Sequence, residues 1–527
     1  MAIISISTIS KILPLLPYYS LITFITLFLV FCIYQVFIHP LSSYPGPFLA
    51  KLSDAYNGFY ANKRCLHVIT RQNRLKYGDV IRQGPNKLVF HSVAALRDIY
   101  KNDRVTKPRE YIAIGPGMTV PNIFTASDRS FHRSRRQLIG QILTDRSMHT
   151  FEPTMVEQRN IFLTRLLKSS RNSSPVDMTD KTRRLGMDIA GLLGFGYDLG
   201  LQFNEENEFM LTVLDMMTPK SYLYFNFFSL RSCVRWLSVL FSGKIREKYL
   251  GMMERIVTAR MSEEKHARHD LYSIVADALD AKSGGLRQSE LWAEANFFLT
   301  AAGETTKTTM SALFFYLSWN PECYIKLAYE IRSTLSSGSE IGGTALTTCH
   351  YLRACIDETL RMSPPASGVL WRERARDDKD DRPLVIDGHV IPTGTVFGMS
   401  TYSLHHNEDY FPDSFVFSPE RWLDQSASET GKKSREAFAA FSIGPRACAG
   451  KSMAYLEMSL VLAKTLWYFD IEAAPGHLGE VGAGRPGLGL GRDRVGEFQL
   501  YDIFNATHSG PYLTFKPRGG FVADLNS

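Results

Sequence analysis

The most informative pattern in this chain is FSIGPRACAG, at residues 441–450. Five residue types stand at fixed offsets in it, as Phe441, Gly444, Arg446, Cys448 and Gly450. Roughly one chain in ten thousand of this length would match them by chance. The residues that follow, KSMAYLEMSLVLAKTLWYF, predict a helix with the cysteine at or just before its N-terminus. We therefore expect the helix dipole and the free N–H groups to lower the pKa of the Cys448 thiol.

Each of these residue types has a physical task if the cysteine sulfur binds the iron of a haem. Gly444 and Gly450 let the backbone approach a flat macrocycle without a side-chain clash. Arg446 offers a positive charge to a haem propionate. The six other cysteines are scattered and form no CxxC pair, so we expect small buried side chains in a reducing compartment. These are Cys32, Cys65, Cys233, Cys323, Cys349 and Cys355.

The pattern FxxGxRxCxG resembles the haem-binding loop of the cytochrome P450 family, and the similarity extends over nearly the whole chain. The resemblance implies a mainly α protein with small β-sheets (α+β) that binds haem b with Cys448 as the metal ligand. It implies that Phe441, Gly444, Arg446 and Gly450 belong to the cofactor-binding loop. It also implies a monooxygenase that inserts one oxygen atom of dioxygen into a C–H bond or a double bond.

A second family pattern lies about 90 residues before the cysteine, in CIDETLRMSPP. Glu358 and Arg361 stand three residues apart on a predicted helix, so their side chains can pair. Together with Arg421 in the later PERW sequence they resemble the family's Glu-Arg-Arg triad. The resemblance implies a structural role for these three residues, in fold stability and haem retention, and no part in the chemistry.

The segment 289–319 predicts a helix of about 30 residues, roughly 45 Å long, which is enough to cross the whole body. Gly303 and the threonines after it are poorly suited to regular helix, so we expect a local distortion at the middle. Ala301 and Ala302 precede Thr305 by four and three residues and therefore share its face, which leaves room for a planar ligand.

Residues 301–306, AAGETT, resemble the acid-alcohol motif of the family. The resemblance implies that Glu304 and Thr305 are catalytic and manage proton transfer to dioxygen. The family usually has glycine where this chain has Ala302, and Gly303 is displaced by one position. This departure puts the local helix geometry in doubt, but the acid and the alcohol are both present.

Two further segments supply candidate ligands for the haem propionates. FTASDRSFHRSRRQL, at 124–138, resembles the family helix that often carries Trp-x-x-x-Arg, with His132 in the aromatic position and Arg136 in the basic one. In LWRER, either Arg372 or Arg374 is a further candidate, and the sequence does not choose between them.

The N-terminal region predicts a membrane anchor. Residues 18–38 form a 21-residue apolar run, and no Asp, Glu, Lys or Arg occurs between residues 12 and 39. This run is long enough to span a membrane and lacks the features of a cleaved signal. Cationic residues are concentrated after it, which predicts a single-pass anchor in the endoplasmic reticulum with the body in the cytoplasm.

The predicted organisation is an N-terminal segment (1–17), the anchor (18–38), a Pro/Gly hinge (39–50) and a catalytic domain (51–527). Alternating residues at 80–92 predict a small sheet, and helical periodicity dominates from 94 to 365. The glycine-rich segment 476–496 has no G-x-G-x-x-G spacing and no strand is predicted before it, so we expect a flexible loop and no dinucleotide site.

The chain ends about 75 residues after the cysteine helix begins and shows no flavin or iron–sulfur segment, so we expect electrons from a separate protein. With a membrane anchor, the implied partner is an NADPH-cytochrome P450 reductase. The net charge of +7 suits an acidic partner or an anionic membrane, and we expect no nucleic-acid partner. A basic docking face and a merely solvated surface are equal interpretations of Arg133, Arg135, Lys432 and Lys433.

By position, the residues expected to line the substrate pocket are Ile114, Phe298, Ala302, Val369 and Leu370. They are mostly apolar, which favours a lipophilic terpenoid, polyketide, sterol or aromatic substrate. The motif wording resembles fungal members, including those of specialised metabolism. Two alternatives are a haem-thiolate isomerase or dehydratase that needs no reductase, and an aromatic-acid or xenobiotic hydroxylase. The acid-alcohol pair argues against the isomerase and against a non-enzymatic haem sensor.

Overall fold

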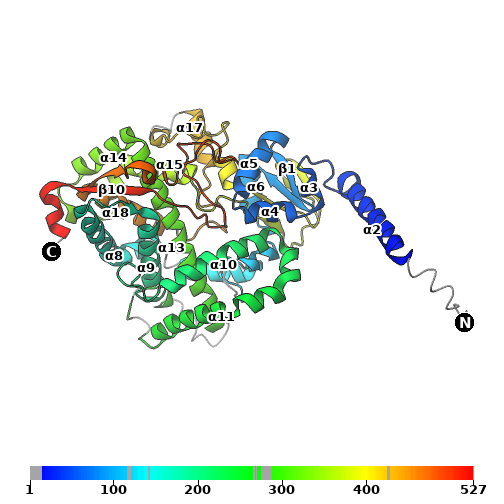
Figure 1. The fold of residues 1–527 in the computed structure, drawn as a ribbon, viewed down its shortest axis with the longest axis horizontal. Coiled ribbons are helices and arrows are strands. Elements are labelled where there is room, and N and C mark those ends of the chain that lie inside the picture. Colours follow the sequence, from blue (N-terminus) through cyan, green and yellow to red (C-terminus); the bar gives the residue numbers. More distant parts are fainter. Residues whose placement is uncertain are drawn as a thin grey trace, which may run out of the picture.

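The structure is a computed structural model, and it describes residues 15–114, 120–140, 143–264, 267–268, 270–273, 288–423 and 428–525. Helices dominate these ranges and the strands form small sheets, which confirms the predicted fold class (Figure 1). Most of the predicted N-terminal segment 1–17 and the side chain of Cys233 lie outside the described residues. Cys65, Cys323, Cys349 and Cys355 are buried, as expected for small core side chains, whereas Cys32 on the apolar N-terminal helix is only half-buried.

The central helix is α13 (Gln288–Trp319), close to the predicted range 289–319. It packs most extensively against α9 (Met178–Phe195) (Figure 1). Other long helices are α8 (Asp145–Arg171), α10 (Glu208–Asn226), α11 (Phe228–Met261), α14 (Pro321–Thr334), α15 (His350–Met362) and α18 (Lys451–Tyr468). Shorter α-helices in the described ranges are α3 (Phe48–Leu52), α4 (Ala55–Asn62), α5 (Leu66–Tyr77), α6 (Val93–Tyr100), α7 (Arg129–Gly140), α16 (Thr401–His405) and α17 (Glu429–Ala437). Short 3-10 helices span Arg109–Ala113, Gly338–Glu340, Ala345–Thr348, Pro419–Trp422, Gly476–Glu480 and Gly519–Leu525.

Within the described ranges the strands form three sheets. The largest has the order β1-β2-β8-β5-β3, and it joins the predicted strands near residue 80 to strands that come about 300 residues later. Its members are β1 (Val80–Gly84), β2 (Lys87–Phe90), β3 (Val105–Thr106), β5 (Arg372–Arg374) and β8 (Val396–Met399), with β2 and β8 parallel. The second sheet is β4 (Val176–Asp177), β10 (Tyr512–Pro517) and β9 (Phe469–Ala473), and the third pairs β6 (Leu384–Ile386) with β7 (His389–Ile391).

The predicted distortion in the middle of the central helix is wrong, because α13 continues as regular α-helix through residues 301–306. The hydroxyls of Thr305 and Thr306 donate to the carbonyls four residues earlier, each at 2.7 Å, which a regular helix allows. Gly303 has a packing role, since a Cβ there would collide with the sulfur of Met187 on α9. The glycine therefore allows a close helix crossing.

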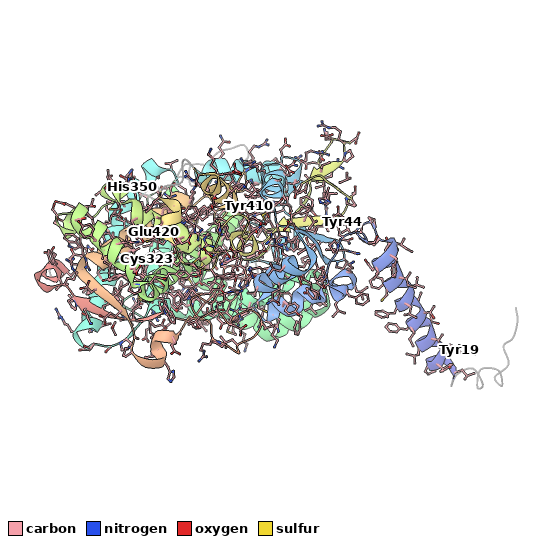
Figure 2. All side chains as sticks on the ribbon, turned by 90° about the horizontal axis from the view of Figure 1, so that it is seen from above. Tyr19, Tyr44, Cys323, His350, Tyr410 and Glu420 are labelled. Atoms are coloured by element: carbon pink, nitrogen blue, oxygen red, sulfur yellow. The ribbon has the colours of Figure 1, made fainter. Side chains whose placement is uncertain are left out.

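The apolar N-terminal run forms α2 (Leu16–Ile33), which continues as a π-helix (Tyr34–Ile38). Among the described residues, the 22-residue stretch Pro17–Ile38 is the one helix long and apolar enough to cross a membrane. It projects from the body, and Figure 2 shows Tyr19 far out on it and Tyr44 where it meets the body. Almost none of this stretch is buried in the protein, so its form is compatible with a membrane anchor.

The Pro/Gly segment after the anchor packs against the large sheet. The backbone N–H of Arg82 in β1 donates to the carbonyl of Pro45 at 2.8 Å, and Leu41 is fully buried. A Cβ on Gly46 would collide with the carbonyl of Arg82. The Arg82 guanidinium also donates to the carbonyl of Gln35 at 2.6 Å, so β1 holds both the segment and the end of the apolar helix.

The glycine-rich segment 476–496 differs from the prediction in one respect, because strand β9 ends only a few residues before it. It opens with the 3-10 helix Gly476–Glu480 and continues in turns, and no α-helix of the kind that receives a pyrophosphate begins there. Although a strand precedes it, segment 476–496 lacks both the glycine spacing and the helix of a dinucleotide-binding motif.

Candidate active site

A cavity of about 290 Å³ lies between the middle of α13, helix α7 and the loop that precedes α18. Cys448 lies on its wall, two residues before the N-cap of α18. The Cys448 side chain has accessible surface although protein surrounds it, because that surface faces the cavity. On the α13 side, Ala301 and Thr305 line the same cavity. The two predicted halves of the site therefore face one space.

The cysteine loop is closed by its own backbone. The N–H of Cys448 donates to the carbonyl of Phe441 at 2.8 Å, and the N–H of Ala447 donates to the carbonyl of Gly444 at 3.0 Å. Phe441 and Gly450 line the cavity as predicted. Gly444 is not among the cavity-lining residues, so its assignment to the macrocycle surface is wrong. Its φ is +75° and a Cβ would collide with the carbonyl of Tyr100, which explains the glycine.

The pKa of the Cys448 thiol differs from the sequence prediction. Burial raises the pKa of the Cys448 thiol above its ordinary value. The backbone N–H of Gly450 and the charges of Arg136 and Lys451 act in the opposite direction, but burial outweighs them. The N–H groups at the start of α18 therefore lower the pKa of Cys448 as predicted, but burial raises it by more.

Cationic side chains crowd one end of the cavity. Lys107, Arg136, Arg372 and Arg446 all line it, and none of them forms an ion pair with a carboxylate in the described part of the chain. Burial, Arg372 and Arg446 lower the pKa of Lys107 well below its ordinary value. Burial and Arg372 lower the pKa of Arg446 to about 10.

Such a cluster of buried like charges is costly unless an anion lies among them. His132 lies on the same wall, and burial together with Arg446, Lys107, Arg136 and Arg372 lowers its pKa to about 3. His132 is therefore neutral at pH 7. A haem carries two propionates, so the cation cluster beside a cavity-facing cysteine fits that cofactor.

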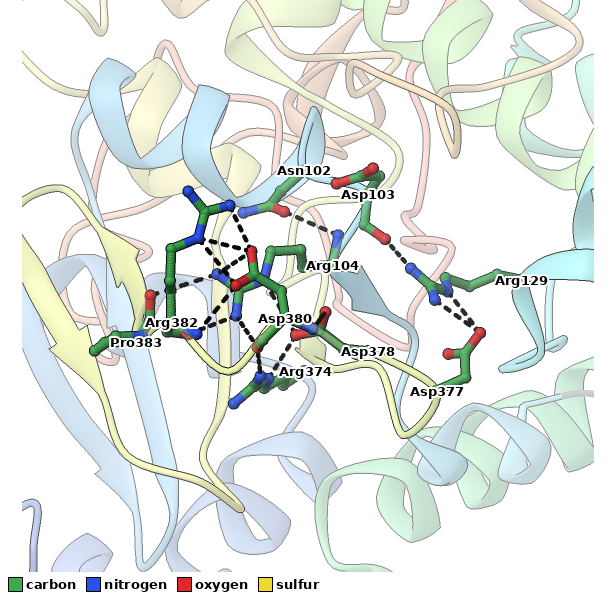
Figure 3. A network of polar contacts seen from close by, with 10 residues as sticks. All are labelled: Asn102, Asp103, Arg104, Arg129, Arg374, Asp377, Asp378, Asp380, Arg382 and Pro383. Carbon is green, nitrogen blue, oxygen red and sulfur yellow. Dashed lines mark hydrogen bonds and ion pairs between the residues drawn. The ribbon is translucent and has the colours of Figure 1, made fainter.

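The structure separates the two arginine candidates of the LWRER segment. Arg372 lines the cavity and its guanidinium lies 4.8 Å from the ring of Tyr100. Arg374 points into a different network, in which its Nε donates to Asp378 at 2.6 Å (Figure 3). Arg104 donates to the same carboxylate at 3.1 Å and to the carbonyls of the following loop (Figure 3). Only Arg372 of the pair is therefore placed for a propionate.

The three residues of the predicted triad meet in the core. Arg361 donates to both carboxylate oxygens of Glu358 at 2.9 Å, and Arg421 donates to one of them at 3.0 Å. Arg361 also donates to the carbonyl of His405 at 3.0 Å. The ring of His405 accepts the backbone N–H of Ala439, just before the cysteine loop, at 2.9 Å. The triad thus connects helix α15 to the segment that carries Cys448.

Glu304 does not lie on the wall of the main cavity. It lines a smaller neighbouring cavity with Arg183 and Asp215, and the two cavities share Ile114, Phe504 and Asn505. Its carboxylate is held by the Nε of Arg183 at 2.7 Å and by the Nζ of Lys307 at 2.6 Å. Burial opposes its ionised form, but Lys307 and Arg183 prevail and lower the pKa of Glu304 to about 2. Glu304 is therefore an ion-paired carboxylate at neutral pH.

Most predicted pocket residues are confirmed as cavity-lining, namely Ile114, Phe298, Ala302 and Leu370. Val369 is not among them and packs instead in a core cluster with Trp371, because neighbouring residues of an extended segment point to opposite sides. Aromatic rings that the sequence did not single out complete the wall. Phe124 stacks on Phe297 at 5.1 Å and meets Phe504 edge-on at 5.2 Å.

The predicted basic face is only partly exposed. Arg133, Lys432 and Lys433 are exposed, but Arg135 is buried and pairs with Glu290 at 2.6 Å. Arg135 is therefore wrong as a docking residue. Two buried acids, Glu294 and Glu457, were also missed, because an acid in a helix is usually solvated and its burial cannot be seen in the sequence.

Glu457 on α18 gives a testable prediction of stability. It is 1% exposed, and in the described structure neither carboxyl oxygen has a hydrogen-bond partner. Burial raises its pKa from 4.5 to about 8, with a smaller opposing effect of the Thr306 hydroxyl. The folded state therefore keeps a proton that the unfolded chain loses above about pH 4.5, so this group's contribution to stability falls as pH rises toward 8.

The substitution Glu457→Gln removes this dependence because glutamine stays neutral. We expect the variant to gain stability relative to the parent protein by up to about 1.4 kcal/mol per pH unit between about pH 5 and pH 8. Urea unfolding of the haem-loaded protein at both pH values measures the difference. The exposed Glu205→Gln is the matched control. A parent-to-variant difference that is the same at both pH values would contradict the raised pKa.

Known proteins are similar to this chain over most of its length. A family model described as Cytochrome P450 matches residues 51–487. The chain is 33% identical over 499 residues to the cytochrome P450 monooxygenase AKT7 of Alternaria alternata, which covers 92% of this chain and 94% of that protein. It is 32% identical over 514 residues to the monooxygenase apf7 of Gibberella fujikuroi, covering 92% and 95%. For poxM of Penicillium oxalicum the identity is 31% over 502 residues, covering 92% and 91%.

Proposed function

The chain belongs to the cytochrome P450 family and is a monooxygenase, and on that premise we propose its finer chemistry. It inserts one oxygen atom of dioxygen into a lipophilic substrate, by hydroxylation or epoxidation, in specialised metabolism such as a terpenoid or polyketide pathway. The observation that carries this proposal is the aromatic cavity with Cys448 on one wall and Thr305 on another. The similarity to fungal monooxygenases supports the metabolic setting.

Haem b is the cofactor that the family implies, and the cavity residues fit it. When bound, haem supplies the iron that activates dioxygen. Cys448 would hold its iron through the thiolate sulfur, and Arg136, Arg372 and Arg446 would pair with its propionates. His132 is neutral and is placed to donate a hydrogen bond at the same end. Arg136 also donates to the carbonyl of Ala447 at 2.9 Å, so it ties helix α7 to the cysteine loop.

Proton supply is assigned to the end of the cavity at α13. The hydroxyl of Thr305 donates its hydrogen bond to the carbonyl of Ala301. The hydroxyl oxygen can therefore still accept a hydrogen bond from a group in the cavity. Glu304 is ionised and lines the smaller cavity. We infer that Glu304 takes up protons from the smaller cavity and releases them toward the main cavity. Each transfer requires the ion pairs of Glu304 with Arg183 and Lys307 to open and form again. Thr305 would orient the group that donates the proton within the main cavity.

The electron donor is a separate protein, as the family implies. We propose an NADPH-cytochrome P450 reductase, which docks by its acidic surface on the exposed cations Arg133, Lys432 and Lys433. The apolar helix Pro17–Ile38 supports anchoring in the endoplasmic reticulum, with the catalytic domain on the cytoplasmic side.

The decisive test of the proposed reaction uses isotopically labelled dioxygen. Membranes that hold the full chain and a diflavin reductase are incubated with NADPH and a panel of terpenoid, polyketide and aromatic compounds. The proposal predicts a product that gains one labelled oxygen atom and forms only when the reductase and NADPH are both present. Rearrangement or dehydration without incorporated label, and without need of the reductase, would instead establish the isomerase or dehydratase alternative.

A further inference from the structure

Glu294 lies on the cavity-facing side of the central helix. It precedes Phe298, Ala301 and Thr305 by four, seven and eleven residues, which is the spacing of one helix face. All four of these residues line the main cavity. An acidic side chain is thus part of the same wall as the proposed catalytic threonine, about 16 Å away along the helix axis.

Only one of the two carboxyl oxygens of Glu294 has a hydrogen-bond partner among the described residues. Its Oε1 accepts the backbone N–H of Ile123 at 2.8 Å, which fixes the turn before α7 to α13. The residue is 3% exposed, and its Oε2 has no hydrogen-bond partner in the described part of the chain. Arg135, the cation that acts on it, donates instead to Glu290 at 2.6 Å.

Apolar side chains make up much of the wall of the cavity that Glu294 lines. Ile123, Ile139, Leu271 and Phe298 line the same cavity. A carboxyl oxygen buried among such side chains is unfavourable unless a donor reaches it. Burial accordingly raises the pKa of Glu294 to about 7, against the smaller effects of the Ile123 N–H and Arg135. Because Glu294 lines the cavity, a ligand bound there is the candidate source of that donor.

We propose that Glu294 accepts a hydrogen bond from a donor group on the substrate, and so determines which part of the apolar body lies beside Thr305. This inference rests on the proposed function, because it takes the cavity as the substrate site. The substrate class it names is an extended lipophilic molecule with a hydroxyl, amide N–H or ammonium group toward one end. The position of oxidation is then set by its distance from that group.

The substitution Glu294→Gln separates this role from support of the Ile123 turn. Glutamine has one acceptor oxygen, and the Ile123 N–H needs it, so the amide NH₂ must face the cavity. The variant keeps the turn contact and the side-chain shape but presents a donor where the parent protein presents an acceptor. A purely structural Glu294 predicts no change in ligand preference.

The test compares dodecanol, its methyl ether and dodecylammonium as probes of the haem-loaded protein. Their binding is measured from the change in Soret absorption, in which an amine that ligates iron is recognised by a shift to the red. We expect the parent protein to bind dodecanol or dodecylammonium about tenfold more tightly than the ether, which cannot donate. In Glu294→Gln the ratio should fall to about one, because the amide NH₂ cannot accept from the two donors and can donate to the ether oxygen. A preference for dodecanol identifies a neutral donor, and a preference for dodecylammonium identifies a cationic one.

Two controls make the outcome decisive. Glu205→Gln alters an exposed carboxylate that does not line the cavity, and the preference should survive in it. If Glu294→Gln fails to fold, Glu294→Met removes the acceptor with a similar shape and should abolish the same preference. The proposal is overturned if the parent protein binds the ether as well as both donors, or if the Glu294 variants keep the ratio. Loss of the proposed function itself is seen separately, as absence of a Cys448-dependent Soret band with carbon monoxide in the parent protein.

Discussion

The substitution Arg361→Leu is expected to destabilise the protein by about 3–5 kcal/mol, the range for breaking a buried ion pair on one side. Arg361 is fully buried and donates to both oxygens of Glu358 and to the carbonyls of His405 and Ser414. Its removal leaves Glu358 with Arg421 as its remaining arginine partner, and leaves the buried carbonyls without a donor. Because His405 also supports the backbone before the cysteine loop, haem content should fall as well.

Urea unfolding and the ratio of haem to protein measure the two effects. Arg382→Leu is the matched control, because the Arg382 side chain is 84% exposed and pairs with Asp380 at the surface. We expect the control to lose less than about 1 kcal/mol. Equal losses in the two variants would contradict the assignment of the triad to fold stability.

The substitution Glu304→Gln is expected to lower kcat by about 100-fold, the scale of a lost proton-transfer group. Glutamine keeps the shape but cannot hold a negative charge between Arg183 and Lys307. Product formation should fall more than NADPH oxidation does, since electrons still arrive while directed proton delivery from Glu304 is lost. The dioxygen that takes up two electrons then leaves as hydrogen peroxide, with its two protons supplied by solvent. Hydrogen peroxide released per NADPH oxidised, measured beside product yield, reports this uncoupling.

The matched control for Glu304 is Asp215→Asn. Asp215 accepts from the same guanidinium of Arg183 at 2.8 Å, but it is 61% exposed and does not line the main cavity. We expect a small change in coupling in this variant. If Asp215→Asn uncouples as strongly as Glu304→Gln, the effect belongs to the position of Arg183, and Glu304 is then no proton carrier.

The parts of the site that the sequence predicted are those fixed by local spacing. Cys448 before a helix, Glu358 three residues from Arg361, and the long apolar segment of α13 each follow from a periodicity or a short motif. The helical interval and the strands near residue 80 were predictable for the same reason. Fold class therefore followed from patterns that need no knowledge of distant contacts.

The parts that the sequence did not predict depend on contacts between distant segments. Arg372 and Arg374 lie two residues apart on β5, so the alternation of a strand directs both side chains to the same face. What distinguishes them is the hydrogen bond that Arg374 donates to Asp378 (Figure 3). Gly444 is required by the carbonyl of Tyr100, more than 300 residues earlier. Burial of Glu294 likewise results from the Ile123 turn that packs against α13. Pairwise sequence spacing carries no information on such neighbours.

The most direct test of the central claim is the absorption spectrum of the dithionite-reduced protein with carbon monoxide, for the parent chain beside Cys448→Ala. Thiolate ligation by Cys448 predicts a Soret band strongly shifted to the red in the parent protein and its absence in the variant. The same red-shifted band in both proteins, or no haem in a correctly folded parent protein, would contradict the assignment of Cys448 as the ligand and the function built on it.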